Sequence, residues 1–134
     1  MTKQIEEKKI IEIFEENSRL DDLILYHCIS SYPVENDELY LLEIERLVDS
    51  YKKKIHGIGF SGHHKGIAPD IAALAIGAEF FERHFTLDRT MEGPDHSASL
   101  TPEELNNFVT AIKKTEIMLG DGIKSPTVSE KKNI

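Results

Sequence analysis

The sequence predicts an α/β fold built on parallel strands. Three short hydrophobic runs alternate with four segments of helical spacing, in the order helix, strand, helix, strand, helix, strand, helix. This alternation is typical of parallel strands that are joined by right-handed crossovers. With 134 residues, of which 40% are hydrophobic and 30% charged, the chain has the composition of one globular domain with a modest core.

The first half of the chain is predicted to form a helix, a strand and a second helix. Residues 3–18 have helical spacing with a single stripe, made of Ile10, Ile13, Phe14 and Asn17. Residues 23–28, LILYHC, are continuously hydrophobic, as in a strand that is covered on both faces. Residues 38–52 return to helical spacing. Their apolar positions are Leu41, Ile44, Leu47, Val48 and Tyr51.

The second half is predicted to contain two further strands and two helices. Residues 55–60 form a strand candidate that two glycines weaken, and residues 79–86 form the last strand. Between them, APDIAALAIG predicts a helix of small residues that ends at Gly77. Thr101 and Glu104 form a capping box around Pro102, which marks the start of the final helix. Its buried stripe is predicted to be Leu105, Phe108, Val109, Ile112 and Leu119.

Polar side chains follow each predicted strand. Because parallel strands end on the same edge of a sheet, we expect these side chains to lie close together. They are Ser30 and Tyr32 after the first strand, Ser61 and His63 after the second, and His84 with Asp95 after the third. Two imidazoles with a nearby carboxylate can bind a divalent metal and leave room for water and substrate oxygens. A metal held in this way could polarise an aldehyde or a ketone.

Ordinary structural roles stay open for these residues. A histidine near a strand end is more commonly a hydrogen-bonded loop residue than a metal ligand, and the chain has six histidines. Three of them have no partner in the pattern and are assigned structural roles: His27, His56 and His96. His64 is left open, because it could simply orient the loop. Glu82 and Arg83 are predicted to form a structural ion pair, with contact to substrate as the alternative.

Charge and cysteine content exclude some classes of partner and site. The formal net charge of -8 argues against a nucleic-acid partner, because the surface would on average repel phosphates. Cys28 is the single cysteine, so no internal disulfide is possible, which fits a reducing cytoplasm. The amino-terminal residues lack an uninterrupted apolar segment, so neither a signal peptide nor a membrane span is predicted.

Three stretches of the sequence resemble the later part of the sialic acid synthase family, which includes N-acetylneuraminate synthases and relatives that make legionaminic or pseudaminic acid. They are LILYHCISSYP, GIGFSGHHKGIAPDIAALAIGAEFFERHFTLDRTMEGPDHSASLTPEEL and LGDGIKSPTVSE, within residues 22–130. The block ERHFTLDRTMEGPDHSASL is the most specific. The resemblance implies a partial (β/α)8 TIM barrel. Residues 1–120 would supply about its last three βα units with a preceding helix, and residues 121–134 a polar tail or linker.

The resemblance also implies a reaction and roles for individual residues. Family members condense phosphoenolpyruvate with an N-acylated sugar aldehyde of the N-acetylmannosamine type and use Mn²⁺ or Mg²⁺. His63 and His84 match the metal-ligating histidines, and Asp95 matches an acidic residue beside the metal and the sugar. Ser30 and Ser61 match positions near the phosphate, and Tyr32 matches one that lines the sugar site. Many relatives carry Asp where this chain has Gly62.

The resemblance covers only part of a barrel. A (β/α)8 barrel has eight strands and about 250 residues, whereas three strands are predicted here. We therefore expect the chain to associate with a copy of itself or with a companion chain that carries the front half, including its phosphoenolpyruvate-binding lysines. Two alternatives stay open: a non-catalytic remnant or assembly module, and a small stand-alone α/β metalloprotein with other chemistry.

Overall fold

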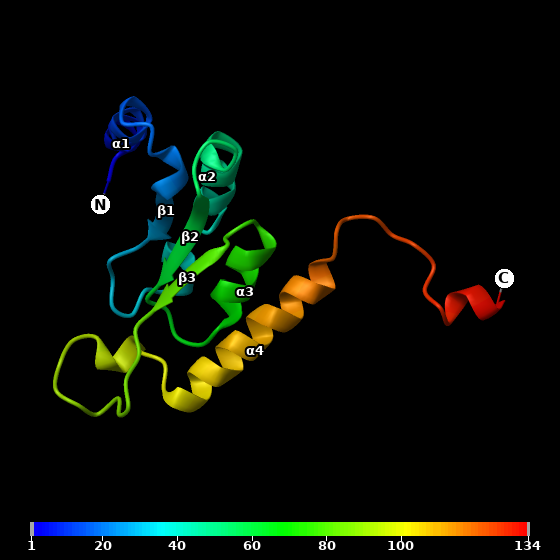
Figure 1. Cartoon of the computed structure of the whole chain (residues 1–134). Coiled ribbons are helices and arrows are strands. Elements are labelled where there is room, and N and C mark those ends of the chain that lie inside the picture. The colour runs from blue at the N-terminus through cyan, green and yellow to red at the C-terminus, as the bar shows by residue number, and fades with distance from the viewer. Residues whose placement is uncertain (1, 134) are drawn as a thin grey trace.

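The computed structural model describes residues 2–133 and contains a three-stranded parallel sheet in the order β1-β2-β3 (Figure 1). The strands are β1 (Ile24–Cys28), β2 (Gly57–Gly62) and β3 (Phe80–Arg83). Each predicted strand and the parallel direction are confirmed. The second strand lies two residues later than predicted, so Ser61 and Gly62 belong to β2 itself and do not follow it.

Four helices connect and flank the strands. They are α1 (Gln4–Glu16), α2 (Leu42–Tyr51), α3 (Ala68–Ala75) and α4 (Pro102–Leu119). The predicted capping box of α4 is confirmed: the Glu104 backbone N–H donates to Thr101 Oγ1 at 3.4 Å, and the Thr101 N–H donates to Glu104 Oε2 at 2.9 Å. Within residues 2–133, no helix combines the length and the apolar character that crossing a membrane requires.

The core lies on the side of the sheet where the helices pack. Alternate strand residues such as Leu25, Ile58 and Phe81 belong to this apolar cluster, because successive side chains of a strand point to opposite faces. The central strand β2 is buried along its whole length, whereas β1 and β3 are each paired on one edge only in the described part of the chain. β2 is therefore the most protected element and the natural support for a site at its end.

Gly59 in β2 has a packing role. A Cβ atom at this position would lie 2.5 Å from the ring of Tyr26, which pairs with Gly59 across the β1–β2 ladder. The missing side chain leaves the space over β2 to the aromatic ring of the neighbouring strand. The glycine that weakens the strand signal in the sequence is thus a requirement of the sheet.

The buried face of α1 differs from the prediction. Ile11 is buried and Ile10 and Phe14 pack against the core, but Ile13 is 57% exposed. At 3.6 residues per turn, Ile13 lies about 160° around the axis from Ile11, so the contact face has rotated away from it. Arg46 of α2 fixes this orientation by donating two hydrogen bonds to Glu7, at 2.7 and 3.1 Å.

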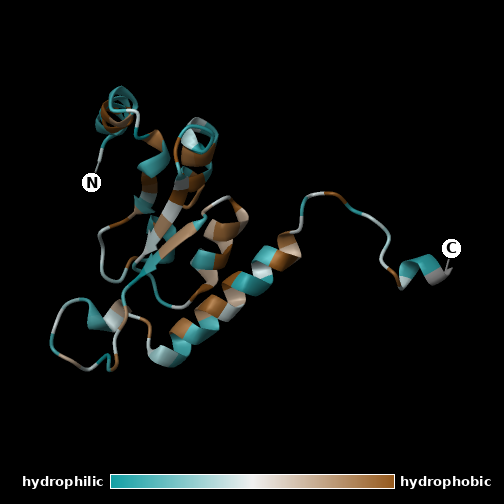
Figure 2. Ribbon diagram, in the orientation of Figure 1, coloured by the Kyte–Doolittle hydropathy of each residue, from teal (hydrophilic) through white to brown (hydrophobic). Residues whose placement is uncertain are grey.

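The predicted stripe of α4 is wrong at Val109 and at Leu119. Phe108 is buried and meets the ring of Phe81 at a centroid distance of 6.0 Å, whereas Val109 and Leu119 are exposed. At Leu119 the cause is length, because α4 has 18 residues, about 27 Å, and α3, on which it packs, has eight, about 12 Å. Hydrophobic residues continue to the far end of α4, and the residues after Gly120 run away from the sheet (Figures 1 and 2).

Candidate active site at the carboxyl ends of the strands

The strand register places the predicted site residues at one edge of the sheet. Cys28 of β1 pairs with Ser61 of β2, and Ser61 pairs with Glu82 of β3, so the three strands end at nearly the same level. His63 is the first residue after β2, and His84 is the first residue after β3. The parallel topology therefore brings together two histidines that are 21 residues apart in the sequence.

Three aromatic side chains converge at this edge. The imidazole of His63 lies 5.0 Å from that of His84 between ring centroids, with the planes at 67°. The Tyr32 ring contacts both, at 4.3 Å from His63 and 5.6 Å from His84. The structure thus joins residues from the ends of all three strands in one cluster, which is hereafter called the His63–His84–Tyr32 cluster.

The environment of His63 fixes which ring nitrogen carries the proton. Nδ1 lies 2.8 Å from the carbonyl oxygen of Ile29, which can only accept a hydrogen bond. Nδ1 therefore carries the hydrogen, and Nε2 keeps a free lone pair. A backbone carbonyl behind one nitrogen is the arrangement that orients metal-ligating histidines, and the residue is buried except for 4% of its surface.

His84 is fixed through its backbone. Its carbonyl oxygen accepts a hydrogen bond from the Leu100 N–H at 2.8 Å, and the Thr86 N–H donates to the Leu100 carbonyl at 2.9 Å. These two bonds close the long loop that carries Asp95. The Asp95 carboxylate lies 3.8 Å from His84 Nδ1, which is too long for a direct hydrogen bond but places the acidic side chain beside the imidazole.

The two predicted serines have different surroundings. Ser61 is buried and donates to Glu82 Oε1 at 2.8 Å. Glu82 is thus engaged with Ser61, and the predicted ion pair between Glu82 and Arg83 is wrong, because neighbouring residues of a strand point to opposite faces. Ser30 is exposed, and its hydroxyl lies 4.0 Å from the thiol of Cys28.

A buried polar network lies directly behind the cluster, and the sequence analysis missed it. Asp70, in the first turn of α3, accepts a hydrogen bond from Arg83 Nη1. His64 Nε2 lies within hydrogen-bond distance of both partners, 3.1 Å from Asp70 Oδ2 and 2.9 Å from Arg83 Nη1. The three side chains are at most 2% exposed. Burial lowers the pKa of Arg83, and the Asp70 carboxylate opposes that shift. This network settles the open role of His64, which packs inward and away from the pair of His63 and His84.

The described residues bring together two side chains of the type expected for a metal site. The imidazoles of His63 and His84 lie 5.0 Å apart between centroids, and Nδ1 of His63 is engaged with the Ile29 carbonyl. Within residues 2–133, no group of three or more His, Cys, Asp or Glu side chains is arranged to hold a metal ion. A metal at this position would therefore keep most of its coordination sites for water, substrate oxygens or groups outside the described residues.

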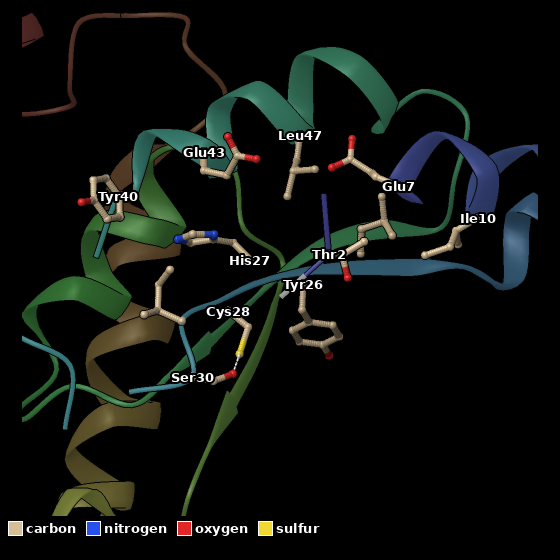
Figure 3. Close-up of a pocket in the computed structure, with 12 residues that line it drawn as sticks. Thr2, Glu7, Ile10, Tyr26, His27, Cys28, Ser30, Tyr40, Glu43 and Leu47 are labelled. Carbon is tan, nitrogen blue, oxygen red and sulfur yellow. Dashed lines mark hydrogen bonds between the residues drawn. The ribbon is translucent and has the colours of Figure 1, made fainter. Parts of the chain in front are cut away.

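A cavity of about 600 Å³ lies beside the outer edge of β1, between α1 and α2. Figure 3 shows Tyr26 and Cys28 on β1 and Ser30 just after it, with Glu43 and Leu47 facing them from α2. Of the predicted site residues, Ser30 alone lines it. The cavity marks the unpaired edge of the sheet and is separate from the His63–His84–Tyr32 cluster.

Gly62 provides a first testable prediction. A Cβ atom at Gly62 would lie 2.7 Å from His64 Cε1 and 3.1 Å from Arg83 Cδ. The Gly62→Ala change is expected to lower the free energy of unfolding by about 1–3 kcal/mol through overpacking. In a chain that also carries His64→Ala, the same change should lower the free energy of unfolding by less, because the ring that the new Cβ would meet is absent. Urea unfolding of the four chains measures this coupling, and equal costs in both backgrounds would contradict it.

Comparison with known proteins identifies relatives of this chain. The NeuB family model matches residues 1–124. The N,N'-diacetyllegionaminic acid synthase of Campylobacter jejuni is 42% identical over 117 residues, which are 87% of this chain and 34% of the relative. Human N-acetylneuraminate-9-phosphate synthase is 43% identical over 99 residues, 72% of this chain and 26% of the relative. The chain thus spans about a third or less of the length of these two relatives.

The solved structures that resemble this one include a synthetase of the same kind. The crystal structure of the N-acetylneuraminic acid (sialic acid) synthetase from Leptospira borgpetersenii in complex with citrate matches with a TM-score of 0.86 and 35% identity. The match covers 99% of this chain and 45% of that one. The three-stranded sheet is accordingly part of the TIM barrel of these proteins, and the chain belongs to the NeuB family of sialic acid and related nonulosonic acid synthases.

Proposed function

We propose that this chain forms the metal-binding part of a nonulosonate synthase, which condenses phosphoenolpyruvate with an N-acylmannosamine-type aldehyde. The observation that carries the proposal is the His63–His84–Tyr32 cluster, in which two imidazoles lie 5.0 Å apart at the carboxyl ends of parallel strands. Active sites of (β/α)8 enzymes lie at this end of the barrel. The names of the relatives, which are synthases of this class of sugar acid, support the same reading.

In this proposal His63 and His84 hold Mn²⁺ or Mg²⁺. The bound ion would supply Lewis-acid polarisation of the sugar aldehyde. The reaction forms a bond between C3 of phosphoenolpyruvate and the aldehyde carbon, and the aldehyde oxygen gains a proton. Water adds at C2, and inorganic phosphate leaves. The hydrogen bond from His63 Nδ1 to the Ile29 carbonyl lets the protein, and not solvent, set the direction of the Nε2 lone pair.

The other residues of the edge would bind and orient the substrates. Tyr32, 43% exposed and packed on both imidazoles, offers an aromatic wall for the sugar. Asp95 can accept a hydrogen bond from a sugar hydroxyl while its charge acts on His84. Ser30 and Ser61 would donate to the phosphate, and Ser61 would have to turn from Glu82 to do so. Such positioning lowers the barrier by aligning the two reacting carbons.

The rest of the barrel is part of the proposal. Both outer strands are unpaired on one edge in the described residues, and the cavity along β1 adjoins one of these edges. We propose that a companion part of the barrel, from a copy or from another chain, pairs with β1 and supplies the cationic groups that phosphoenolpyruvate requires. We place this assembly in the cytoplasm, where the free thiol of Cys28 would stay reduced.

A chimera provides the test of activity. This chain would replace the matching segment of the Campylobacter jejuni synthase, to which it is 42% identical. We expect release of inorganic phosphate from phosphoenolpyruvate only when an N-acylated amino-sugar aldehyde is present. Chelation by EDTA should abolish the release, and Mn²⁺ should restore it. The matched control is the same chimera with His63→Ala and His84→Ala, which should release none.

The unpaired edges also favour a second candidate, a non-catalytic assembly module. Apolar residues are exposed beside the cavity, among them Tyr40 at 69% and Leu42 at 70%. Such a module would fold within the chimera, but the chimera would have no synthase activity. A folded chimera with no sugar-dependent phosphate release, together with a chain that self-associates in light scattering, would favour this candidate and reject the synthase.

A further inference from the structure

We propose that Arg83 is a positioning residue, which fixes the separation of the His63 and His84 imidazoles by clamping the loop after β2 to the end of β3. The inference deepens the proposed function and rests on it, because it concerns the two histidines that are assigned to the metal there.

The clamp consists of hydrogen bonds from one guanidinium to two loop carbonyls. Arg83 Nη2 donates to the His64 carbonyl oxygen at 2.8 Å, and Nη1 donates to the Gly66 carbonyl oxygen at 3.1 Å. His64 directly follows His63, and Arg83 directly precedes His84. His63 is therefore one residue away from a carbonyl that the guanidinium holds, and His84 is one residue away from the arginine itself.

Asp70 holds the guanidinium in turn. Its Oδ2 accepts from Arg83 Nη1, and His64 Nε2 lies 3.1 Å from this oxygen and 2.9 Å from Arg83 Nη1. The carboxylate and the guanidinium together therefore tie α3 to the loop and to β3. Gly62 completes the arrangement, because the His64 ring and the Arg83 stem occupy the space that a side chain at that position would fill. These contacts thus join the loop after β2, α3 and the end of β3 to one another beside the His63–His84–Tyr32 cluster.

The cost of the network indicates that stability alone does not account for it. A buried ion pair commonly stabilises a fold no more than well-packed apolar side chains of the same volume. The backbone pairing of β2 with β3 already reaches Gly62 and Arg83, and this pairing does not involve the side chains of the network. A planar guanidinium, however, can hold two carbonyls and a carboxylate in fixed directions, which neither an apolar side chain nor a lysine can do. The guanidinium therefore fixes the position of the loop after β2 relative to β3 and α3.

The test uses the 134-residue chain with Arg83→Lys, which keeps the charge beside Asp70 but cannot hold both loop carbonyls. Long-range ¹H–¹⁵N NMR of the imidazoles reports the Nδ1–H form of His63 without any metal. We expect the His63 and His84 signals to shift and the His63 tautomers to mix. Calorimetry should show Mn²⁺ affinity falling by about 10- to 100-fold, as for other residues that orient ligands.

The matched control is Arg46→Lys. Arg46 also forms forked hydrogen bonds, to Glu7 and Glu43, but it joins α1 to α2. This variant is expected to leave the His63 and His84 signals unchanged. A folded Arg83→Lys chain whose imidazole signals match those of the wild type would overturn the clamp.

A second variant covers the case in which Arg83→Lys does not fold. Arg83→Met with Asp70→Leu removes both buried charges together. A folded chain with altered imidazole signals supports the clamp, and one with unchanged signals overturns it. Loss of the fold in this variant as well overturns the proposal, because the network is then a folding requirement. A wild-type chain that binds no Mn²⁺ would contradict the proposed function alone, since the NMR readout needs no metal.

Discussion

Replacing His63 and His84 together by alanine is expected to abolish Mn²⁺ binding by this chain. Each is an imidazole at the end of a strand, and their centroids are 5.0 Å apart. Changing a residue that only orients a ligand commonly costs 10- to 100-fold in metal affinity, so removing both ligands should cost more than about 100-fold. Isothermal titration calorimetry of the 134-residue chain measures this directly, with Mg²⁺ titrated in parallel.

The control for this prediction is His56→Ala. His56 is exposed and immediately precedes β2, at the opposite end of that strand from His63. It tests whether any histidine of the chain contributes to a weak, unspecific affinity. Unchanged Mn²⁺ affinity in the double variant, or an equal loss in the His56 variant, would remove the metal site from these two residues and with it the chemical basis of the proposed function.

The order of the elements could be predicted from sequence because each signal is local. The apolar run of residues 23–28, the small-residue helix of APDIAALAIG and the capping box at Thr101 each involve residues within a few positions of one another. The alternation of helices and strands predicted that the strands are parallel. The parallel direction then predicted that His63 and His84, at the ends of two strands, lie near one another. The structure brings their rings together, as the common strand ends required.

The polar network behind the histidines could not be predicted in the same way. Asp70 and Arg83 are 13 residues apart, and in the sequence Asp70 is one acidic residue in the first turn of a helix, where a solvated role is common. Arg83 beside Glu82 suggested a pair between neighbours, although side chains of adjacent strand residues point to opposite faces. The available signal was a single acidic residue in a helix whose other residues are all apolar.

The sequence also could not predict which apolar residues of the helices are exposed. Periodicity shows that α1 and α4 each have an apolar side, but which residues become buried depends on what lies against them. Ile11 is buried in place of Ile13, and the end of α4 extends past its support. Such residues depend on neighbours that are distant in the sequence, and for this chain part of the barrel of its relatives lies outside the residues that match.

The largest loss of stability is expected for Phe60→Ala. Phe60 is 1% exposed and lies in the central strand β2. Its ring is stacked with those of His27, at 6.0 Å and 15°, and His64, at 5.6 Å and 11°. Truncating a buried phenylalanine commonly lowers the free energy of unfolding by about 3–5 kcal/mol. That is a large fraction of the roughly 5–15 kcal/mol by which whole domains are stable.

The loss should fall at the upper end of this range because the cavity cannot collapse. His27 is held by the Leu39 carbonyl at 2.8 Å, and His64 is held by Asp70, so neither ring is free to move into the space. Urea unfolding followed by circular dichroism gives the difference, and Phe85→Ala is the matched control, since Phe85 is 51% exposed. If both variants unfolded at the same urea concentration, the prediction would be contradicted, because the stability of the core would not depend on Phe60. The packing of Phe60 on the His64 ring would then not be needed to hold that ring in place.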